Sequence, residues 1–407
     1  MMISILTNKN FRNFFVSDII SGFGVGLIMI AENWYVFTQT NSTKYVGFLL
    51  AFTVIASFIV SPIAGICADI FNRKNVISIT YVVRISFLLV IALVFLMHGF
   101  DIRLMYLLSI INGIGWTFYM STSRSFIQEL LPKNLLIKGN SLLEICLQSG
   151  MLFSGAIFGI FFEYFGFVNI LFINIIVFLI SNFIVSRIQY NSIISTIDNE
   201  KFFKSFIAGL SYLRKRKVIF VFGIITIIPL AVTMIYNVVL PAYVNEISKN
   251  SSIVFGISDM FYGIGGLVSG FGVALIIKKM RNNQIIFLFF IIAISDLLSL
   301  YLNTNVFVLY FCSLLLGVSN STLKIVMNTV LMENVDKQFM GRATAVWTAI
   351  SLLIQAVGTS TMGIIIDNFG AKYGFLCMAL LMFIGVISFV FIYSMINLIK
   401  KENSNVK

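Results

Sequence analysis

Charged residues are scarce in this 407-residue chain: they make up 11% of it, whereas soluble domains carry about 25%. Hydrophobic residues account for 59%. A chain this apolar cannot cover its own surface with polar groups, so most of that surface is expected to face lipid. The composition excludes an ordinary soluble protein.

Three further absences narrow the function. The four cysteines lie inside apolar segments without paired spacing, which argues against a disulfide framework or a metal site. No Gly-x-x-x-x-Gly-Lys-Ser/Thr loop occurs, so the chain is not expected to use ATP by itself. No polar segment is long enough for a catalytic domain. We therefore expect neither an enzyme nor a bound cofactor.

Apolar runs long enough to cross a bilayer recur along the whole chain, and they are continuous rather than alternating. Helices satisfy their own backbone groups in lipid, so these runs predict an all-α integral membrane protein and exclude a strand barrel. The twelve predicted spans are 14–38, 44–68, 76–98, 104–123, 139–163, 167–187, 218–244, 252–277, 285–302, 305–327, 343–366 and 371–398.

The basic residues fall between these spans and predict the topology. Of the 28 lysines and arginines, 22 lie in segments that would be cytoplasmic if the N-terminus is cytoplasmic. Only Lys44, Arg103, Lys249 and Lys372 lie in the outer loops. Positive loops stay inside, so both termini are expected in the cytoplasm. The net charge of +12 is thus a topology signal, and no nucleic-acid partner is expected.

The longest polar stretch, residues 189–217, lies at the midpoint of the chain. Its apolar residues follow helical spacing and it ends in four basic residues, which predicts an amphipathic helix on the inner membrane surface. A solvated linker is the alternative. The predicted organisation is one bundle over 1–188, the linker over 189–217 and a second bundle over 218–407.

The two bundles share a repeat. Residues 159–166 read GIFFEYFG and residues 363–370 read GIIIDNFG, an offset of 204 residues. Six spans return the chain to the same side, so the halves are expected to have the same orientation and to be pseudo-symmetric. The first Gly of each copy allows close helix approach, and each Phe-Gly is expected to turn the chain into the next helix.

The segment GICADIFNRK between the second and third spans carries the most specific pattern. Gly65, Asp69, Arg73 and Lys74 match the Gly-x-x-x-Asp-x-x-x-Arg-Lys loop of the major facilitator superfamily, which the chain resembles over its whole length. The resemblance implies two six-helix bundles that rock against each other. It also implies a cytoplasmic gate at these four residues. The alternative is a topological Arg-Lys pair near a capping Asp. Asn72 stands where the family usually has Gly and is expected to tolerate a left-handed turn.

Three segments resemble the macrolide-efflux and enterobactin-exporter-like branch of that superfamily: 124–142, 204–217 and 332–346. This resemblance implies a monomeric antiporter of a bacterial-type cell membrane that exports a drug-, macrolide- or siderophore-like molecule in exchange for protons. Two departures weaken the antiport expectation. The segment SIINGIGW lacks the helix 4 Arg of many proton-coupled exporters, and GMLFSGAIFG lacks the Gly-Pro pair of helix 5.

Two acids inside the spans are candidates for proton coupling. Glu32 lies in the first span, which lines the cavity in this family, and Asp259 lies in the eighth. A charge at bilayer depth is costly and needs a reason. A structural carboxyl is the alternative for each. Asp18 and Arg84 lie nearer the cytoplasmic ends of their spans and are expected to snorkel or to pair.

The substrate cavity is expected to be lined by aromatic and amide side chains on helices 1, 4 and 7. Such walls suit amphipathic organic molecules. The candidates are Trp34, Tyr35, Asn112, Trp116, Tyr119, Tyr236 and Asn237. An importer or facilitator, and a non-transporting receptor or scaffold on the same fold, remain alternatives. The gate loop argues against the last.

Overall fold

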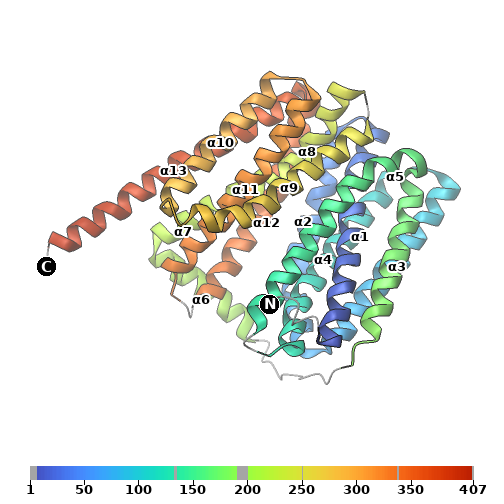
Figure 1. Cartoon of the computed structure of the whole chain (residues 1–407), viewed down its shortest axis with the longest axis horizontal. Coiled ribbons are helices and arrows are strands. Elements are labelled where there is room, and N and C mark those ends of the chain that lie inside the picture. The colour runs from blue at the N-terminus through green and yellow to red at the C-terminus, as the bar shows by residue number, and fades with distance from the viewer. Residues whose placement is uncertain (1–6, 133–134, 190–199, 250, 337–338, 406–407) are drawn as a thin grey trace. The chain divides into compact units, whose positions relative to one another are not determined.

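The structure, a computed structural model, describes residues 7–132, 135–189, 200–249, 251–336 and 339–405. Within these ranges every regular element is a helix (Figure 1), as the apolar runs predict. The helices are α1 (Lys9–Thr40), α2 (Thr43–Ile70), α3 (Arg73–His98), α4 (Ile102–Leu130), α5 (Leu136–Ser186), α6 (Glu200–Lys215), α7 (Lys217–Ile225), α8 (Ile227–Ser248), α9 (Ser252–Ile276), α10 (Asn282–Leu302), α11 (Val306–Asn334), α12 (Met340–Phe369) and α13 (Ala371–Asn405).

Ten segments of the described chain are long and apolar enough to cross a membrane. The ten segments compare with twelve predicted spans as follows. The fourth predicted span lies on α4, which is 29 residues long but is not one of the ten. The fifth and sixth share α5, whose helical backbone is broken at Gly166. In the seventh span, α7 and α8 are separated at Thr226 because Pro229 has no N–H to donate to the preceding turn.

The repeated Phe-Gly pairs make the predicted turns. Gly166 has φ 71° and ψ 174°, and Gly370 has φ 100° and ψ 159°. Side chains are strained at such positive φ values, so glycine is favoured at both positions. Gly166 interrupts α5, and Gly370, 204 residues later, lies between α12 and α13.

The 204-residue offset also relates α4 to α11. Tyr106, Ser109 and Gly113 of α4 recur as Tyr310, Ser313 and Gly317 of α11. Gly113 and Gly317 each allow a neighbouring helix to approach closely. A methyl group on Gly113 would overlap the carbonyl of Thr53 in α2, and one on Gly317 would overlap the carbonyl of Tyr262 in α9. The repeat therefore includes a close backbone contact in each half.

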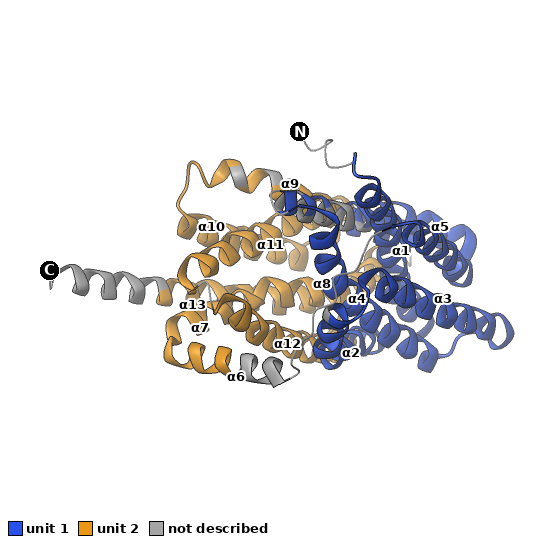
Figure 2. Ribbon diagram, turned by 90° about the horizontal axis from the view of Figure 1, so that it is seen from below, with its two compact units in different colours: residues 1–199, 250–260 blue, residues 200–249, 261–407 orange. Residues whose placement is uncertain are grey.

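The chain divides into two compact units, coloured separately in Figure 2. Unit 1 comprises residues 1–199 and 250–260, and unit 2 comprises residues 200–249 and 261–407. This division differs from the predicted domains at residues 250–260 and at the predicted linker, 189–217, which is split between the two units. The difference at 250–260 has a local cause, because Ser252 and Ile253 of α9 pack against Gly159 of α5.

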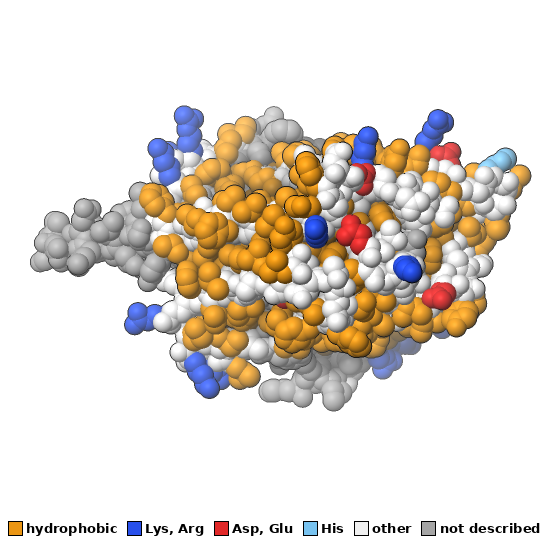
Figure 3. All heavy atoms as spheres, turned by 90° about the horizontal axis from the view of Figure 1, so that it is seen from above, with side chains coloured by type: hydrophobic (Ala, Val, Ile, Leu, Met, Phe, Trp, Pro, Cys, Tyr) orange, Lys and Arg blue, Asp and Glu red, His pale blue; other side chains and the backbone are white. Residues whose placement is uncertain are grey.

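Large hydrophobic side chains remain exposed over both units, and they cover much of the face in Figure 3. Ile59 on α2 is 62% exposed, Leu96 on α3 62% and Phe311 on α11 61%. Water would penalise so much apolar surface, whereas lipid does not. The exposed surface fits the multi-pass membrane protein that the composition predicts.

The polar midpoint contains the predicted helix as α6, and this end of the linker packs against other parts of unit 2. Tyr212 stacks on Phe339 with ring centroids 4.5 Å apart, and Arg216 pairs with Asp336 at 3.0 Å. Leu213 is fully buried, while Ile207 stays 61% exposed. The first part of the predicted linker, residues 190–199, lies outside the described residues.

Candidate functional site

A buried acid, amide and guanidinium meet inside unit 1. The Asn112 side chain on α4 donates a hydrogen bond to Oε1 of Glu32 on α1. The guanidinium Nη2 of Arg84 on α3 donates to the backbone carbonyl of Asn112 at 3.0 Å. Glu32 and Arg84 are only 3% and 2% exposed and attract each other electrostatically. We call these three residues the Glu32 cluster.

Glycines on α4 make room for this cluster. A methyl group on Gly115 would overlap Nε of Arg84, so the guanidinium occupies the space that glycine leaves. Gly113, two residues earlier, brings α4 against α2, where Ser57 donates to the Gly113 carbonyl at 3.1 Å. The segment NGIGW thus places Asn112 beside Glu32 and Arg84 beside α4.

Of the two outcomes expected for Arg84, snorkelling is not observed, because its guanidinium lies inside the bundle. It stands 5.1 Å above the ring of Phe178 on α5. The sequence held one signal for it: a single basic residue within an apolar span. The contact with Gly115 could not be read from that signal. The α4 segment without an arginine of its own is therefore contacted by the guanidinium of Arg84 from α3.

A second polar group lies nearby on α1, α3 and α4. The hydroxyl of Tyr119 donates to a carboxylate oxygen of Asp18, which is fully buried instead of snorkelling. The Tyr119 ring lies 6.0 Å from that of Tyr81. Arg84 interacts electrostatically with both tyrosines. Tyr119 and Tyr81 therefore link Asp18 to Arg84 of the Glu32 cluster inside unit 1.

The predicted cavity aromatics of α1 are packed within unit 1. Trp34 stacks on Phe255 of α9, with centroids 4.9 Å apart, and Tyr35 stacks on Phe167 of α5 at 4.2 Å. Trp34 is 1% exposed. Trp116, on α4, is half-buried.

In unit 2 the predicted Tyr236 belongs to a neutral hydrogen-bonded group. Its hydroxyl lies 2.7 Å from that of Ser313 on α11, and its ring stacks on Tyr262 of α9 at 5.1 Å. The Asn320 amide donates to the Tyr262 hydroxyl at 3.2 Å. Asn237, the neighbour of Tyr236, is half-buried. Asn320 was not among the predicted cavity residues.

Asp259 lies where α9 packs on α5 within unit 1. A methyl group on Gly155 would lie 3.1 Å from Oδ2 of Asp259, and one on Gly159 would lie 2.6 Å from the Cα of Ile253. Gly256 faces the Gly155 carbonyl in the same way. The two helices therefore touch through glycines, with the carboxylate of Asp259 at the contact.

The basic pair of the predicted gate is anchored within unit 1. Arg73 forms an ion pair with Glu129 at the end of α4. The ammonium of Lys74 donates to the carbonyls of Ser186 and Ile188 at 2.7 and 2.8 Å, so it satisfies the end of α5. The side chain of Asp69 lies outside the described residues.

Asn72 and Gly65 complete the description of this loop. Asn72 has φ −59° and caps α3, accepting a hydrogen bond from the Asn75 N–H at 3.3 Å. The expected left-handed turn is therefore wrong, and asparagine is present as an N-cap. A methyl group on Gly65 would meet no described atom within 4 Å.

Comparisons with known proteins agree with this fold. The model of the family described as transmembrane secretion effector matches residues 2–406. The staphyloferrin A transporter of Staphylococcus aureus (strain NCTC 8325 / PS 47) is 22% identical over 97% of this chain and 98% of its own length.

Two solved structures are also similar. A point mutant of the nucleoside transporter NupG superposes with a TM-score of 0.75 at 14% identity, over 96% of this chain and all of that one. A D-xylose-proton symporter superposes with a TM-score of 0.69 at 16% identity, over 97% and 98% of the two chains. At such identities these structures establish the fold alone, which is that of major facilitator transporters.

Proposed function

Because the chain belongs to the transmembrane secretion effector family, we propose that it exports a small organic molecule in exchange for protons. The chain is a secondary transporter of the major facilitator type, not an enzyme. Its staphyloferrin A-transporting relative, a siderophore transporter, favours a siderophore-like substrate over other drug-like molecules.

The Glu32 cluster is the observation that carries the proposal. A charged side chain at bilayer depth costs ~2.5–3.5 kcal/mol, so a buried acid and guanidinium require a compensating role. Deprotonated Glu32 is stabilised by Arg84 and by the Asn112 amide. A proton on Glu32 removes its attraction to Arg84 while the Asn112 hydrogen bond persists. Protonation would thus change the charge of the Glu32 cluster while its hydrogen bond to Asn112 is kept.

Asp259 is the second proposed coupling carboxylate. It lies at the close glycine contact of α5 and α9. A proton gained or lost there would alter the charge at this contact. Coupling requires that proton affinity differ between the two transport states.

The substrate is proposed to contact aromatic and amide side chains. The candidates are Trp34, Tyr35, Asn112, Trp116, Tyr119, Tyr236 and Asn237. Gly65, Asp69, Arg73 and Lys74 would form the cytoplasmic gate. We place the transporter, as a monomer, in a bacterial cell membrane with both termini cytoplasmic, in keeping with the distribution of lysine and arginine.

Purified protein in weakly buffered solution tests the coupling. Adding staphyloferrin A, or members of a drug panel, should release protons from the wild type. Glu32→Gln keeps the side-chain size and removes the titration, so substrate should still bind without releasing protons. Glu163→Gln, which neutralises an exposed acid of α5, is the matched control and should behave as wild type. Unchanged proton release from Glu32→Gln would reject Glu32 as the proton carrier.

A further inference from the structure

A groove lies at one end of unit 2, between α7, α10, α11 and α13. Its cavity has a volume of about 130 Å³. The buried floor consists of Phe222, Leu331, Phe389 and Ile392, each at most 6% exposed. Apolar cavities of roughly 150 Å³ stay dry and accept small hydrocarbon groups. The floor of this groove therefore suits a hydrocarbon chain.

The walls of the groove reach the surface and become polar there. Val218, Ile219 and Val330 are half-buried, and the side chains of Asn283 and Asn334 complete the lining. An apolar floor below an amide rim matches the boundary between acyl chains and headgroups.

Two lysine and arginine residues are close neighbours of the rim residues in the sequence. Lys217 immediately precedes Val218, and Arg281 lies two residues before Asn283; both are exposed. Arg216 is also near, but it pairs with Asp336 at 3.0 Å. Lys217 and Arg281 belong to segments predicted to be cytoplasmic, where the bilayer surface is negatively charged.

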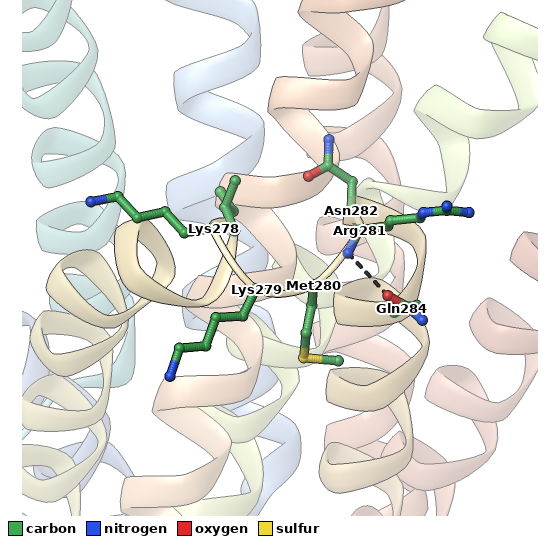
Figure 4. Close-up of a pocket in the computed structure, with 7 residues that line it drawn as sticks. Lys278, Lys279, Met280, Arg281, Asn282 and Gln284 are labelled. Atoms are coloured by element: carbon green, nitrogen blue, oxygen red, sulfur yellow. Dashed lines mark hydrogen bonds between the residues drawn. The ribbon is translucent and has the colours of Figure 1, made fainter.

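The basic loop between α9 and α10 does not form a phosphate pocket by itself. Figure 4 shows that Lys278, Lys279 and Arg281 spread to different sides instead of pointing toward one another. A free phosphate is held tightly by donors that converge on it. These side chains suit the surface of a lipid layer better than a single small anion.

We propose that this groove binds an anionic phospholipid, with an acyl chain on Phe222, Leu331 and Phe389 and the phosphate near Lys217 and Arg281. The site lies within unit 2 and is separate from the Glu32 cluster in unit 1. The lipid would fasten the starts of α7 and α10 to the membrane surface. This inference does not depend on the direction of transport or on its coupling ion.

Native mass spectrometry of the full-length protein tests the site. The probes are phosphatidylglycerol and phosphatidylcholine with identical acyl chains. We expect the wild type to bind phosphatidylglycerol more tightly. The double variant Lys217→Gln/Arg281→Gln should lose about ten-fold or more of that affinity, because each cation near a membrane surface contributes ~1 kcal/mol. Its affinity for phosphatidylcholine should not change.

Two further variants keep the test decisive. Val330→Trp places a large side chain in the groove from a half-buried wall. It should weaken the binding of both lipids. Lys249→Gln/Lys372→Gln removes two cations of unit 2 from loops predicted to be outside, and should leave both affinities intact. The proposal fails if wild type and Lys217→Gln/Arg281→Gln bind phosphatidylglycerol equally. It also fails if millimolar inorganic phosphate displaces the lipid, because the site would then recognise phosphate alone.

Discussion

Arg84 of α3 lies against Gly115 of α4, at a position where a methyl group would overlap its guanidinium. The same guanidinium donates to the carbonyl of Asn112, whose side chain holds Glu32. One glycine thus permits a buried arginine, and the arginine provides the positive charge beside a buried acid.

Gly115→Ala should destabilise the protein by about 1–3 kcal/mol, the usual penalty for overpacking a filled interior. The added methyl group forces Arg84 away from Asn112. Thermal unfolding in detergent measures the effect. Gly270→Ala is the matched control on α9, since a methyl group there meets no described atom within 4 Å. Equal melting temperatures for the two variants would contradict the contact.

Arg84→Gln should lower stability strongly, by about 3–5 kcal/mol, because it leaves the Glu32 carboxylate buried without its cation. Adding Glu32→Gln should recover much of that loss, since two neutral amides need no counter-ion. Comparing the two single variants with the double variant isolates the pair. Strictly additive losses would mean that Glu32 and Arg84 do not act on each other.

Asp69→Asn should reduce export without preventing membrane insertion, if the loop after α2 is a cytoplasmic gate. The lost negative charge would favour the state that is open to the cytoplasm. Export from loaded vesicles and membrane protein levels are measured together. Normal export at normal protein levels would leave Arg73 and Lys74 with a purely structural role.

Cysteine labelling tests the predicted topology. In a variant with the four native cysteines replaced, Asn191→Cys should react with an impermeant maleimide only from the cytoplasmic side. Arg103→Cys should react only from outside. Arg103 is preferred over Asp101, whose side chain caps α4 by accepting from the Arg103 N–H at 2.8 Å. The opposite pattern would invert the assignment of both loops.

Much of the fold was predictable because it depends on local sequence. Continuous apolar runs predicted the helices, and the two Phe-Gly pairs predicted turns where Gly166 and Gly370 have positive φ values. Apolar runs and Phe-Gly turns can be recognised from residues that are neighbours in the sequence. The helix α6 was also predictable, whereas its docking depends on Phe339 and Asp336, which are distant in the sequence.

The candidate site was less predictable for the same reason. Glu32 and Asn112 could be selected separately as polar residues in apolar spans, but nothing in the sequence pairs them. Arg84 was expected to snorkel or to pair because it lies nearer the cytoplasmic end of its span. Its true environment depends on the space left by Gly115 on another helix. Asn72 shows the same limit at a loop, where its capping hydrogen bond replaces the expected left-handed turn.

Gly113 and Gly317 lie 204 residues apart and make the same kind of backbone contact, yet their surroundings differ. Two residues after Gly113, Gly115 lies against the charged guanidinium of Arg84. Three residues after Gly317, the polar side chain is the neutral Asn320, which donates to Tyr262. This is the outcome expected of a duplicated ancestor whose halves inherited one scaffold and then diverged in their linings. Chemistry in one half could therefore change through mutation while the helix contacts that hold both halves were retained.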